Sequence, residues 1–510
     1  MKKNKVFFLS ILLAVSAALA EAPAITPKAP AVADTCYQVN NVEELYGFAA
    51  IINNDSGFVR DTSVKCMELK ADLVVNKKVL TDDWELASED TASYTPWNPI
   101  RYFIGTIKGN GHSISGLFIK QENKDNQLGF FGHFGGRIED LHIKDSYVED
   151  GHSSVYHYVG GFCGENAGAG NTRYGIRFIK SSFSGTVRSE SYMAIGGFVG
   201  NLDAMAFIED SKMSGKVLGK SYMGGFVGQT DSDVSITRSF NEAAIGSENT
   251  SGTAAGFVGY ASGTFSPDIN ITESYNKGSV TSSDAAAGFI GYFTHANSKI
   301  INSYNSGAIK ARSNIGGFIA SNKVGGSYPD LVIYNSFNVG TIETSTYTTY
   351  MGLQGQLRNT QNLTLDNAFF VKDTLFNDSS TFYGEAIALS DFEDGTLLKT
   401  LQAFKNDTID GSVWYQEIGK DKHPILKSRT TGITPKKSVL ANYAKVSVEG
   451  SYIKLNNMSP KSKFSIFDLQ GCVLKHGVAQ GSAELFKVPH AGTFVVKING
   501  TSNIVHVLSK

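Results

Sequence analysis

The sequence predicts an all-β protein: a right-handed parallel β-helix (solenoid) of about eight repeats with short capping helices, followed by a small C-terminal antiparallel β-sandwich. Two short motifs alternate through the middle of the chain, at the period of a repeat architecture. The 510 residues include 53 glycines and only 11 prolines, which favours many tight turns over disorder. A chain of this length also needs several domains or a repeat array, because one globular core does not grow so large.

The N-terminus has the features of a secretory signal peptide. Lysines within the first five residues precede an apolar run from Val6 to Leu19, and Ala18-Leu19-Ala20 fits the small-x-small cleavage rule. We therefore expect residues 1–20 to be removed and residues 21–34, rich in Ala and Pro, to form an extended linker. No later apolar stretch approaches the length of a membrane-spanning helix, so no transmembrane segment is expected.

The cysteines are consistent with export. Cys36 and Cys66 are separated by about one solenoid coil, so we expect them side by side on adjacent strands. A disulfide there would staple the N-terminal end; the alternative is two buried thiols. Cys163 occupies a motif position that Val or Ile fills elsewhere, which predicts a small core residue.

Two motifs define the repeats, which we place at residues 35–430 together with their caps. The first is Gly-Gly-Phe-Val-Gly or a close variant. The second is Ser-Phe/Tyr-Asn-x-Gly-x-Val/Ile, complete at 274–280, 303–309 and 336–342. In each motif we expect one aromatic and one β-branched residue to point inward, with Asn and Gly at corners. Stacked coils would then form continuous core columns, so these residues are predicted as core and corner, not as a site. The Phe of the first motif recurs every 28 to 36 residues, at Phe162, Phe198, Phe226, Phe257, Phe289 and Phe318.

Both ends of a solenoid need covering, and two helical segments are predicted to do this. Residues 42–52 carry apolar side chains at helical spacing, with Asn41 as a suitable N-cap. Near the other end, Leu397, Leu401 and their apolar neighbours predict a second short helix, capped by Ser390 or Asp391.

The repeats resemble the GLUG-motif family over about residues 37 to 430. The segments 44–49, 69–76 and 105–117 also match the usual N-terminal part of such proteins, although Lys108 stands where the family more often has Asp. The resemblance implies a bacterial surface or secreted β-helix protein. Such repeats occur in adhesins and in some proteases that carry separate catalytic domains, so the resemblance is specific for fold and weak for function.

The last 70 residues differ in character. After a linker at 431–440, short alternating strands separated by turns predict an Ig-like β-sandwich over 441–510. The segments 464–471 and 491–498 resemble the C-terminal sorting domain of the type IX secretion pathway, with Cys472 as a mild departure. The resemblance implies recognition by outer-membrane secretion machinery and a secreted or cell-surface location in a Gram-negative bacterium. The alternative is an ordinary Ig-like stalk or binding module.

The search for chemistry predicts no catalytic residue, no metal site and no cofactor. GxSxG, HExxH, CxxC and P-loop motifs are all absent from the sequence. Lyase chemistry needs acids and a base on one face of neighbouring coils, but Ala204 and Gly263 correspond to Asp231 and Asp233. The net charge of -2 and the lack of a basic stripe argue against a nucleic-acid partner.

One loop carries aromatic residues that are candidates for ligand contact: Trp84, Tyr94, Trp97 and Tyr102. Flat aromatic side chains stack well on sugar rings, and core packing is the alternative for this group.

These observations predict a monomeric, non-catalytic, exported surface protein, not an enzyme, that serves adhesion or binds a polysaccharide or host surface through its solenoid. The alternatives are a structural envelope or spacer protein and a carbohydrate-active β-helix enzyme, either a lyase or a hydrolase.

Overall fold

The chain divides into two compact units, Met1–Ile433 and Thr434–Lys510. The predicted signal peptide and the predicted linker at 431–440 lie outside the described residues. This computed structural model describes residues 25–121, 127–152, 157–169, 172–190, 192–246, 252–263, 267–294, 296–322, 330–344, 352–357, 363–372, 384–406, 409–427, 445–449, 452–456, 463–467, 473–479, 483–488, 492–498 and 501–507.

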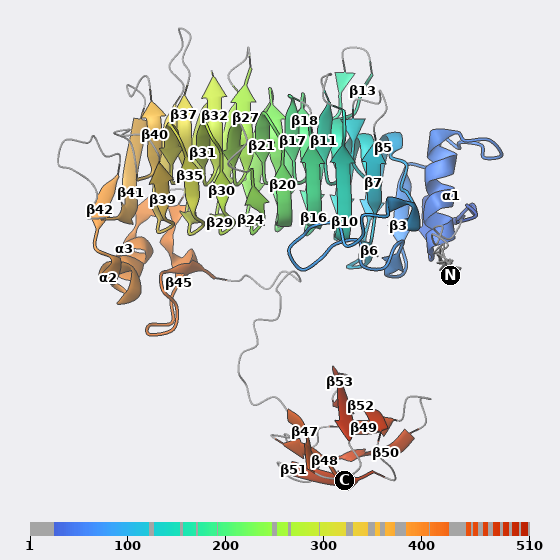
Figure 1. The fold of residues 1–510 in the computed structure, drawn as a ribbon. Helices are drawn as coiled ribbons and strands as arrows, with labels where there is room; N and C mark the ends of the chain where they lie inside the picture. The colour runs from blue at the N-terminus through green and yellow to red at the C-terminus, as the bar shows by residue number, and fades with distance from the viewer. Residues whose placement is uncertain are drawn as a thin grey trace, which may run out of the picture. The chain divides into compact units, whose positions relative to one another are not determined.

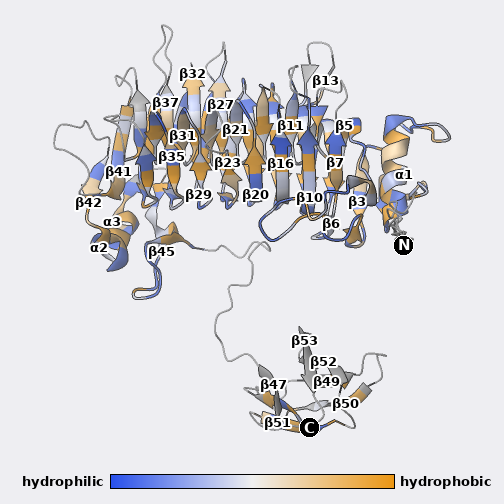
Figure 2. Cartoon of the chain, viewed as in Figure 1, coloured by the Kyte–Doolittle hydropathy of each residue, from blue (hydrophilic) through white to orange (hydrophobic). Residues whose placement is uncertain are grey.

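The first unit is a parallel β-solenoid, as predicted (Figure 1). Each strand pairs in parallel with the equivalent strand of the next coil, so backbone hydrogen bonds run along the solenoid axis at the usual spacing of about 4.8 Å. Hydrophobic and hydrophilic residues alternate along the strands (Figure 2). This alternation places one set of side chains in a core shared by all coils.

Four columns of parallel strands build the solenoid. The first consists of β5 (Ile100–Lys108), β9 (Phe131–Glu139), β12 (Cys163–Asn166), β18 (Val199–Leu202), β22 (Val227–Thr230), β27 (Val258–Ser262), β32 (Ile290–Thr294), β37 (Ile319–Asn322) and β40 (Gln354–Leu357). The second passes through the ends of β5 and β9 and adds β2 (Cys36–Val39), β3 (Cys66–Leu69), β15 (Ile176–Ile179), β19 (Ala206–Glu209), β23 (Val234–Thr237), β28 (Asp268–Thr272), β33 (Asn297–Ile301), β38 (Leu331–Asn338) and β41 (Leu363–Val371).

The other two columns complete each coil. The third consists of β4 (Leu73–Val74), β6 (Ser113–Ser115), β7 (Phe118–Gln121), β10 (His142–Asp150), β16 (Ser182–Ser189), β20 (Lys212–Leu218), β24 (Phe240–Asn241), β25 (Ala244–Ile245), β29 (Tyr275–Asn276), β30 (Val280–Thr281), β34 (Tyr304–Asn305), β35 (Ile309–Ala311), β39 (Ile342–Thr344) and β42 (Glu385–Ile387). The fourth is a seven-stranded sheet of β8 (Gln127–Leu128), β11 (Tyr158–Gly160), β17 (Ala194–Gly196), β21 (Tyr222–Gly224), β26 (Thr253–Ala255), β31 (Ala285–Ala287) and β36 (Asn314–Gly316). Short antiparallel additions are β1 (Ala31–Ala33) on β2 and the pair β13 (Gly168–Ala169) and β14 (Thr172–Arg173).

The first motif supplies the centre of the core. Its six Phe residues are fully buried and stack from coil to coil with ring centroids 4.6–5.1 Å apart. The last Gly of the motif is required where the chain doubles back between two columns. A Cβ on Gly228 would lie 2.5 Å from the Ile195 backbone nitrogen and 2.7 Å from the Gly200 carbonyl oxygen. Any side chain there would force the fourth column away from the first.

The second motif differs from the prediction, because its aromatic residue points outward and its Asn points inward. Asn276 is fully buried; its Nδ2 donates to Asn305 Oδ1 at 2.7 Å and to the Gly278 carbonyl at 2.9 Å. Asn241 Nδ2 donates in turn to Asn276 Oδ1 at 2.8 Å, so the amides form a ladder along the axis. A buried Asn is tolerated because each coil satisfies the amide of the next. Periodicity could not reveal this, since the partner exists only after stacking.

The N-terminal end is covered by α1 (Val42–Asn53), as the sequence predicted. Asn41 Oδ1 accepts the Glu44 backbone N–H at 2.9 Å, which is the expected N-cap. Leu45 and Phe48 are fully buried, and the Phe48 ring packs edge-on against Phe103 with centroids 5.6 Å apart. The helix therefore closes the core at the first coil.

The C-terminal cover differs in detail from the expected single helix. It contains α2 (Leu389–Glu393) and α3 (Thr396–Ala403), with Gly395 rather than Ser390 or Asp391 before α3. These helices pack on the flank of the last coils, where Tyr304 and Phe337 project outward with Trp414 against them. Outward aromatic side chains need such a cover to be buried. The cover ends with β43 (Lys405–Asn406), β44 (Ile409–Asp410), the 3-10 turn Gly411–Val413, β45 (Trp414–Tyr415) and β46 (Ile425–Leu426).

The second unit is built from two antiparallel sheets, as predicted for a small sandwich. One contains β47 (Lys445–Glu449), β48 (Tyr452–Asn456) and β51 (Ala483–Lys487). The other contains β50 (Val473–Val478), β49 (Lys463–Phe467), β52 (Gly492–Ile498) and β53 (Thr501–Val507). Ile453, Ile466 and Val496 are fully buried between them. No helix among the described residues is long and apolar enough to cross a membrane.

Candidate functional site

Two of the four predicted ligand-binding residues are core residues. Trp97 is 2% exposed; its ring stacks on Phe130 at 4.9 Å, and its indole N–H donates to the Phe130 carbonyl at 3.1 Å. Tyr94 is 7% exposed and packs against Phe118, with ring centroids 5.0 Å apart. Neither ring is open to a ligand, because the loop that carries them folds down onto the solenoid and buries its own aromatic side chains.

Trp84 lies at the tip of that loop and is half-buried. Its backbone has a φ of 63°, which is a strained conformation for a bulky residue. Contacts to distant coils hold the tip: Thr186 Oγ1 donates to the Trp84 carbonyl at 2.6 Å, and Lys216 forms an ion pair with Glu85. At its base, the Val79 backbone N–H donates to the Asp145 carboxylate at 2.9 Å. The tip is therefore fixed across several coils.

Tyr102, the fourth predicted residue, is the first member of a longer row. Strand register places it opposite His133, and each following coil as far as β37 contributes one residue at the same position. All are polar or tyrosine. We call this set the polar row: Tyr102, His133, Glu165, Asn201, Gln229, Tyr260, Tyr292 and Ser321.

The first motif itself positions the polar row. From His133 onward, each row residue directly follows the last Gly of a motif, or Ala320 in the final copy. The residues on either side are core: Val227 and Thr230 are fully buried, whereas Gln229 between them is half-buried. In each coil the motif therefore places a core residue, then Gly (Ala320 in the last copy), then a polar or tyrosine row residue. Most row residues are half-buried, whereas Asn201 and Ser321 are buried.

The N-terminal half of the row is joined through the Glu165 carboxylate. It accepts from Gln127 Nε2 and Asn201 Nδ2, each at 3.1 Å, and lies 3.5 Å from His133 Nε2. Burial alone would raise the pKa of Glu165, but hydrogen bonds from His133, Asn201 and Gln127 hold the pKa below its ordinary value. Glu165 is therefore ionised at neutral pH.

Tyr158 lies beside this part of the row. Its pKa is raised, first by burial and then by the negative charges of Glu165, Asp203 and Asp231. The surroundings of Tyr158 are therefore acidic, which matters for the kind of ligand that the row attracts.

The C-terminal half of the row is aromatic. Tyr260 stacks on Tyr222 of the adjoining column, with centroids 4.4 Å apart, and faces Tyr292 at 5.6 Å. The hydroxyl groups of Tyr260 and Thr294 are hydrogen-bonded at 2.8 Å. Since the ring faces lie against one another, the rings offer a ligand mainly their edges and hydroxyl groups. Nearby, Ser262 Oγ donates to Asp231 Oδ1 at 2.8 Å.

A buried Asp–His–Ser group lies elsewhere on the solenoid. The Asp150 carboxylate is 3.0 Å from His157 Nδ1 and accepts the Ser189 hydroxyl at 2.9 Å, and all three side chains are buried. The Ser189 proton points to the carboxylate, so this arrangement satisfies a buried charge and does not activate a nucleophile. His152, which the sequence places near His157, has its ring centroid 5.3 Å from that of His157.

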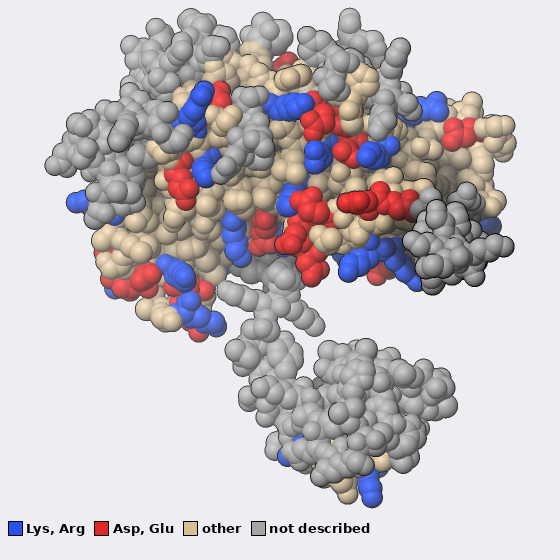
Figure 3. All heavy atoms as spheres, viewed as in Figure 1, with Lys and Arg blue, Asp and Glu red and all other residues tan. Residues whose placement is uncertain are grey.

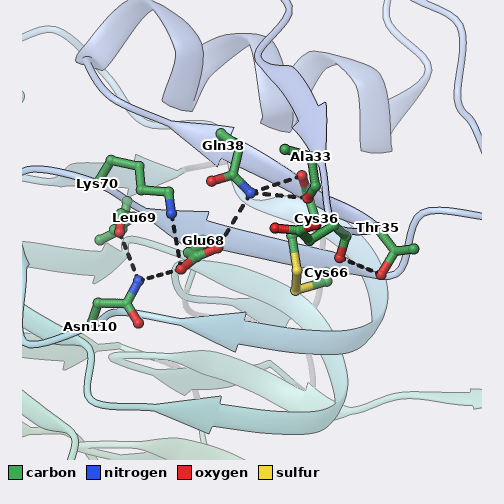
Figure 4. The surroundings of a disulfide bond; sticks show 10 residues. Ala33, Thr35, Cys36, Gln38, Cys66, Glu68, Leu69, Lys70 and Asn110 are labelled. Carbon is green, nitrogen blue, oxygen red and sulfur yellow. Dashed lines mark hydrogen bonds and ion pairs between the residues drawn. A yellow bond between two sulfur atoms is a disulfide. The ribbon is translucent and has the colours of Figure 1, made fainter.

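The remaining predicted site is the cysteine pair, which is bonded in the structure. Cys36 on β2 and Cys66 on β3 form a disulfide with their Cα atoms 4.3 Å apart (Figure 4). Glu68 beside it accepts from Gln38, Asn110 and Lys70. Cys163 is a buried thiol whose pKa is raised by burial and by Glu165, which fits a core residue and not a nucleophile.

Charges of both signs are spread over the face of the solenoid drawn in Figure 3, with no single basic or acidic field. Within the described ranges, no group of three or more His, Cys, Asp and Glu side chains is arranged to hold a metal ion.

Comparison with known proteins gives a likeness in fold only. No family model matches the chain, and no curated protein matches it. One similar solved structure is a protein from Bacteroides ovatus provisionally named an immunoglobulin A1 protease: 14% identity over 78% of this chain and 93% of that chain, with a TM-score of 0.41. Another is a protein named IgA1 protease: 14% identity over 92% of this chain and 34% of that chain, with a TM-score of 0.39.

These findings change one prediction and leave two as they were. Both neighbours are named as proteases, which contradicts the expectation that this chain is not an enzyme, and we withdraw that expectation. A likeness at this level assigns no activity or substrate to the chain. The resemblances to the GLUG-motif family and to the type IX sorting domain stay predictions, since no family model matches.

Sequence reasoning found Tyr102 but not the rest of the polar row. The signal was present, because the row residue always follows the repeated motif. It was missed because the residue type changes from coil to coil, as from Glu165 to Tyr260, whereas a search for repeats weighs the positions that stay the same.

Proposed function

We propose that this protein is exported to the bacterial surface and binds a polysaccharide along the polar row of its solenoid. The observation that carries the proposal is the register of eight polar or tyrosine side chains, one per coil, along a single column. Coils recur at about 4.8 Å, a spacing comparable to that of the sugar units in an extended polysaccharide. A repeated ligand can therefore meet a repeated set of side chains.

The chemistry of the row supports the same ligand class. Amide, carboxylate and hydroxyl groups from Gln229, Glu165 and Tyr260 are suited to sugar hydroxyls, and the tyrosines also offer their ring edges. Export rests on the signal-like N-terminus and on the resemblance of the C-terminal unit to a sorting domain. In this proposal the C-terminal unit is recognised by outer-membrane secretion machinery, and the solenoid acts as a monomer.

The test is depletion of the full chain from solution by insoluble bacterial and plant polysaccharides. We expect saturable depletion by at least one polymer and a loss of affinity of about tenfold or more in Tyr260→Ala and Gln229→Ala. Asn270→Ala and Lys299→Ala, half-buried positions on β28 and β33, are the matched controls and should bind like the unmodified chain.

The same samples are read for chemistry. New reducing ends would turn the proposal towards a carbohydrate-active enzyme, and cleavage of added immunoglobulin A would add the activity named for the two structural neighbours. Depletion that survives both row substitutions would place binding elsewhere on the chain. No depletion by any polymer would overturn the proposal in favour of a spacer role or a protein partner.

A further inference from the structure

The acidic half of the polar row has unused hydrogen-bonding capacity, and all of it is acceptor capacity. Asn201 is 3% exposed, and its Nδ2 donates to Glu165 Oε1 at 3.1 Å and to Asp203 Oδ1 at 3.0 Å. Because both neighbours are carboxylates, the amide can only be oriented with its nitrogen towards them. Its Oδ1 is buried and has no hydrogen-bond partner. An unpaired buried acceptor is rare, and it favours a ligand that donates.

Besides Asp203, this part of the solenoid carries the carboxylates of Glu165 and Asp231. Glu165 has neutral donors and His133 around it, and Asp231, two coils further on, is exposed and accepts from Ser262. Among the described residues, neither carboxylate is paired with Lys or Arg. Several other acids on the strands are paired with Lys or Arg, as Glu209 is with Arg177. This part of the row therefore has negative charge available for a ligand.

We infer that the polysaccharide bound by the row carries protonated amino groups, as a polymer of amino sugars does, and that these groups lie between Glu165, Asn201 and Asp231. The inference rests on the proposed function and names its ligand class. An ammonium group has three donors and no acceptor, which matches a site that offers only acceptors. A neutral sugar hydroxyl also donates, but it leaves both carboxylates without a counter-charge.

A lysine-rich protein segment is the other source of ammonium groups. The polar row favours the sugar polymer, because its tyrosine members continue for two coils beyond the acids, through Tyr260 and Tyr292. A ligand recognised by charge alone would gain little from that half of the row.

The test compares matched ligands by titration calorimetry with the full chain: oligomers of glucosamine, the same oligomers N-acetylated, and polylysine. We expect the glucosamine oligomer to bind roughly tenfold more tightly than its acetylated form, as two partly screened charge pairs would produce. Asp231→Asn and Glu165→Gln should each reduce that difference severalfold, and added salt should weaken it. Glu343→Gln removes an exposed carboxylate far along the chain and should leave the difference unchanged.

The outcomes separate this inference from the proposed function. Equal binding of both oligomers, with loss of both in Tyr260→Ala, would overturn the amino-sugar inference and leave polysaccharide binding standing. Polylysine that binds as tightly as glucosamine and is unaffected by Tyr260→Ala would also overturn it, in favour of a charge site. Asp231 is exposed, so Asp231→Asn keeps the test valid if Glu165→Gln fails to fold.

Discussion

At the scale of single residues, the solenoid depends on polar side chains that find partners only in the next coil. The inner Asn residues of the ladder, Asn276 and Asn305, each accept from the amide on one side and donate to the amide on the other. An unmade hydrogen bond inside such a stack costs more than a made one contributes. The ladder therefore disfavours any slip in register, because a shifted coil would leave amides unpaired.

Asn276→Ala tests this role. The substitution leaves Asn305 Oδ1 and the Gly278 carbonyl without their donor, so the free energy of unfolding should fall by on the order of 1–3 kcal/mol. Chemical denaturation measures the loss. Asn270→Ala removes a half-buried side chain in the same coil and should change the free energy of unfolding by less than about 0.5 kcal/mol. Equal effects of the two substitutions would contradict a special role for the ladder.

Glu165 gives a second residue-scale prediction, based on pH. Its pKa in the folded chain lies below the ordinary 4.5. The stabilisation from its ionised form is therefore fully present above about pH 4.5 and is lost as the pH falls through the folded value. Denaturation at a series of pH values measures the free energy of unfolding of the unmodified chain and of Glu165→Gln. The unmodified chain should be the more stable of the two near neutral pH, and this difference in stability should shrink as the pH falls. A difference in stability that stays constant down to low pH would show that ionised Glu165 does not stabilise the fold.

At the scale of elements, the first coil is held by two devices, α1 over the core and the disulfide between β2 and β3. A terminal coil has a neighbour on one side only, so it opens more readily than the coils in the middle. A covalent link between its strands opposes that opening.

Replacing Cys36 and Cys66 by Ser should therefore loosen the N-terminal end. The disulfide closes a loop of 30 residues, for which chain-entropy estimates give about 3–4 kcal/mol. Hydrogen exchange should increase in residues 36–69 and stay unchanged in β27 and β32, which lie six or more coils away. Unchanged exchange at the N-terminal end would mean that α1 alone holds the first coil. Mass measurement of the unmodified chain, with and without reduction, establishes that the bond forms.

The parallel solenoid, the helix at 42–53 and the antiparallel C-terminal sheets were predictable, because they rest on periodicity and on local capping. The outward aromatic of the second motif was not, and the sequence left core packing and ligand contact open for Trp97. Both depend on what covers a surface from elsewhere in the chain, as α2 and α3 cover Phe337. Local pattern carries no information on such contacts.

At the scale of the whole molecule, a repeat fold turns one local geometry into an extended surface. Eight row residues in register span seven coil spacings of about 4.8 Å, roughly 34 Å in all. No single coil holds more than one of them. Affinity should therefore come from many modest contacts along the axis and not from one deep pocket.

Binding along the row can be tested by measuring the affinity of the full chain for oligosaccharides of increasing length, cut from whichever polymer depletes the chain from solution. If the polar row binds an extended chain, affinity should rise with each added sugar until the oligosaccharide spans the row and then level off, and Tyr260→Ala should flatten the rise. Affinity that is already maximal with one or two sugars, or a rise that is unchanged in Tyr260→Ala, would contradict binding along the row.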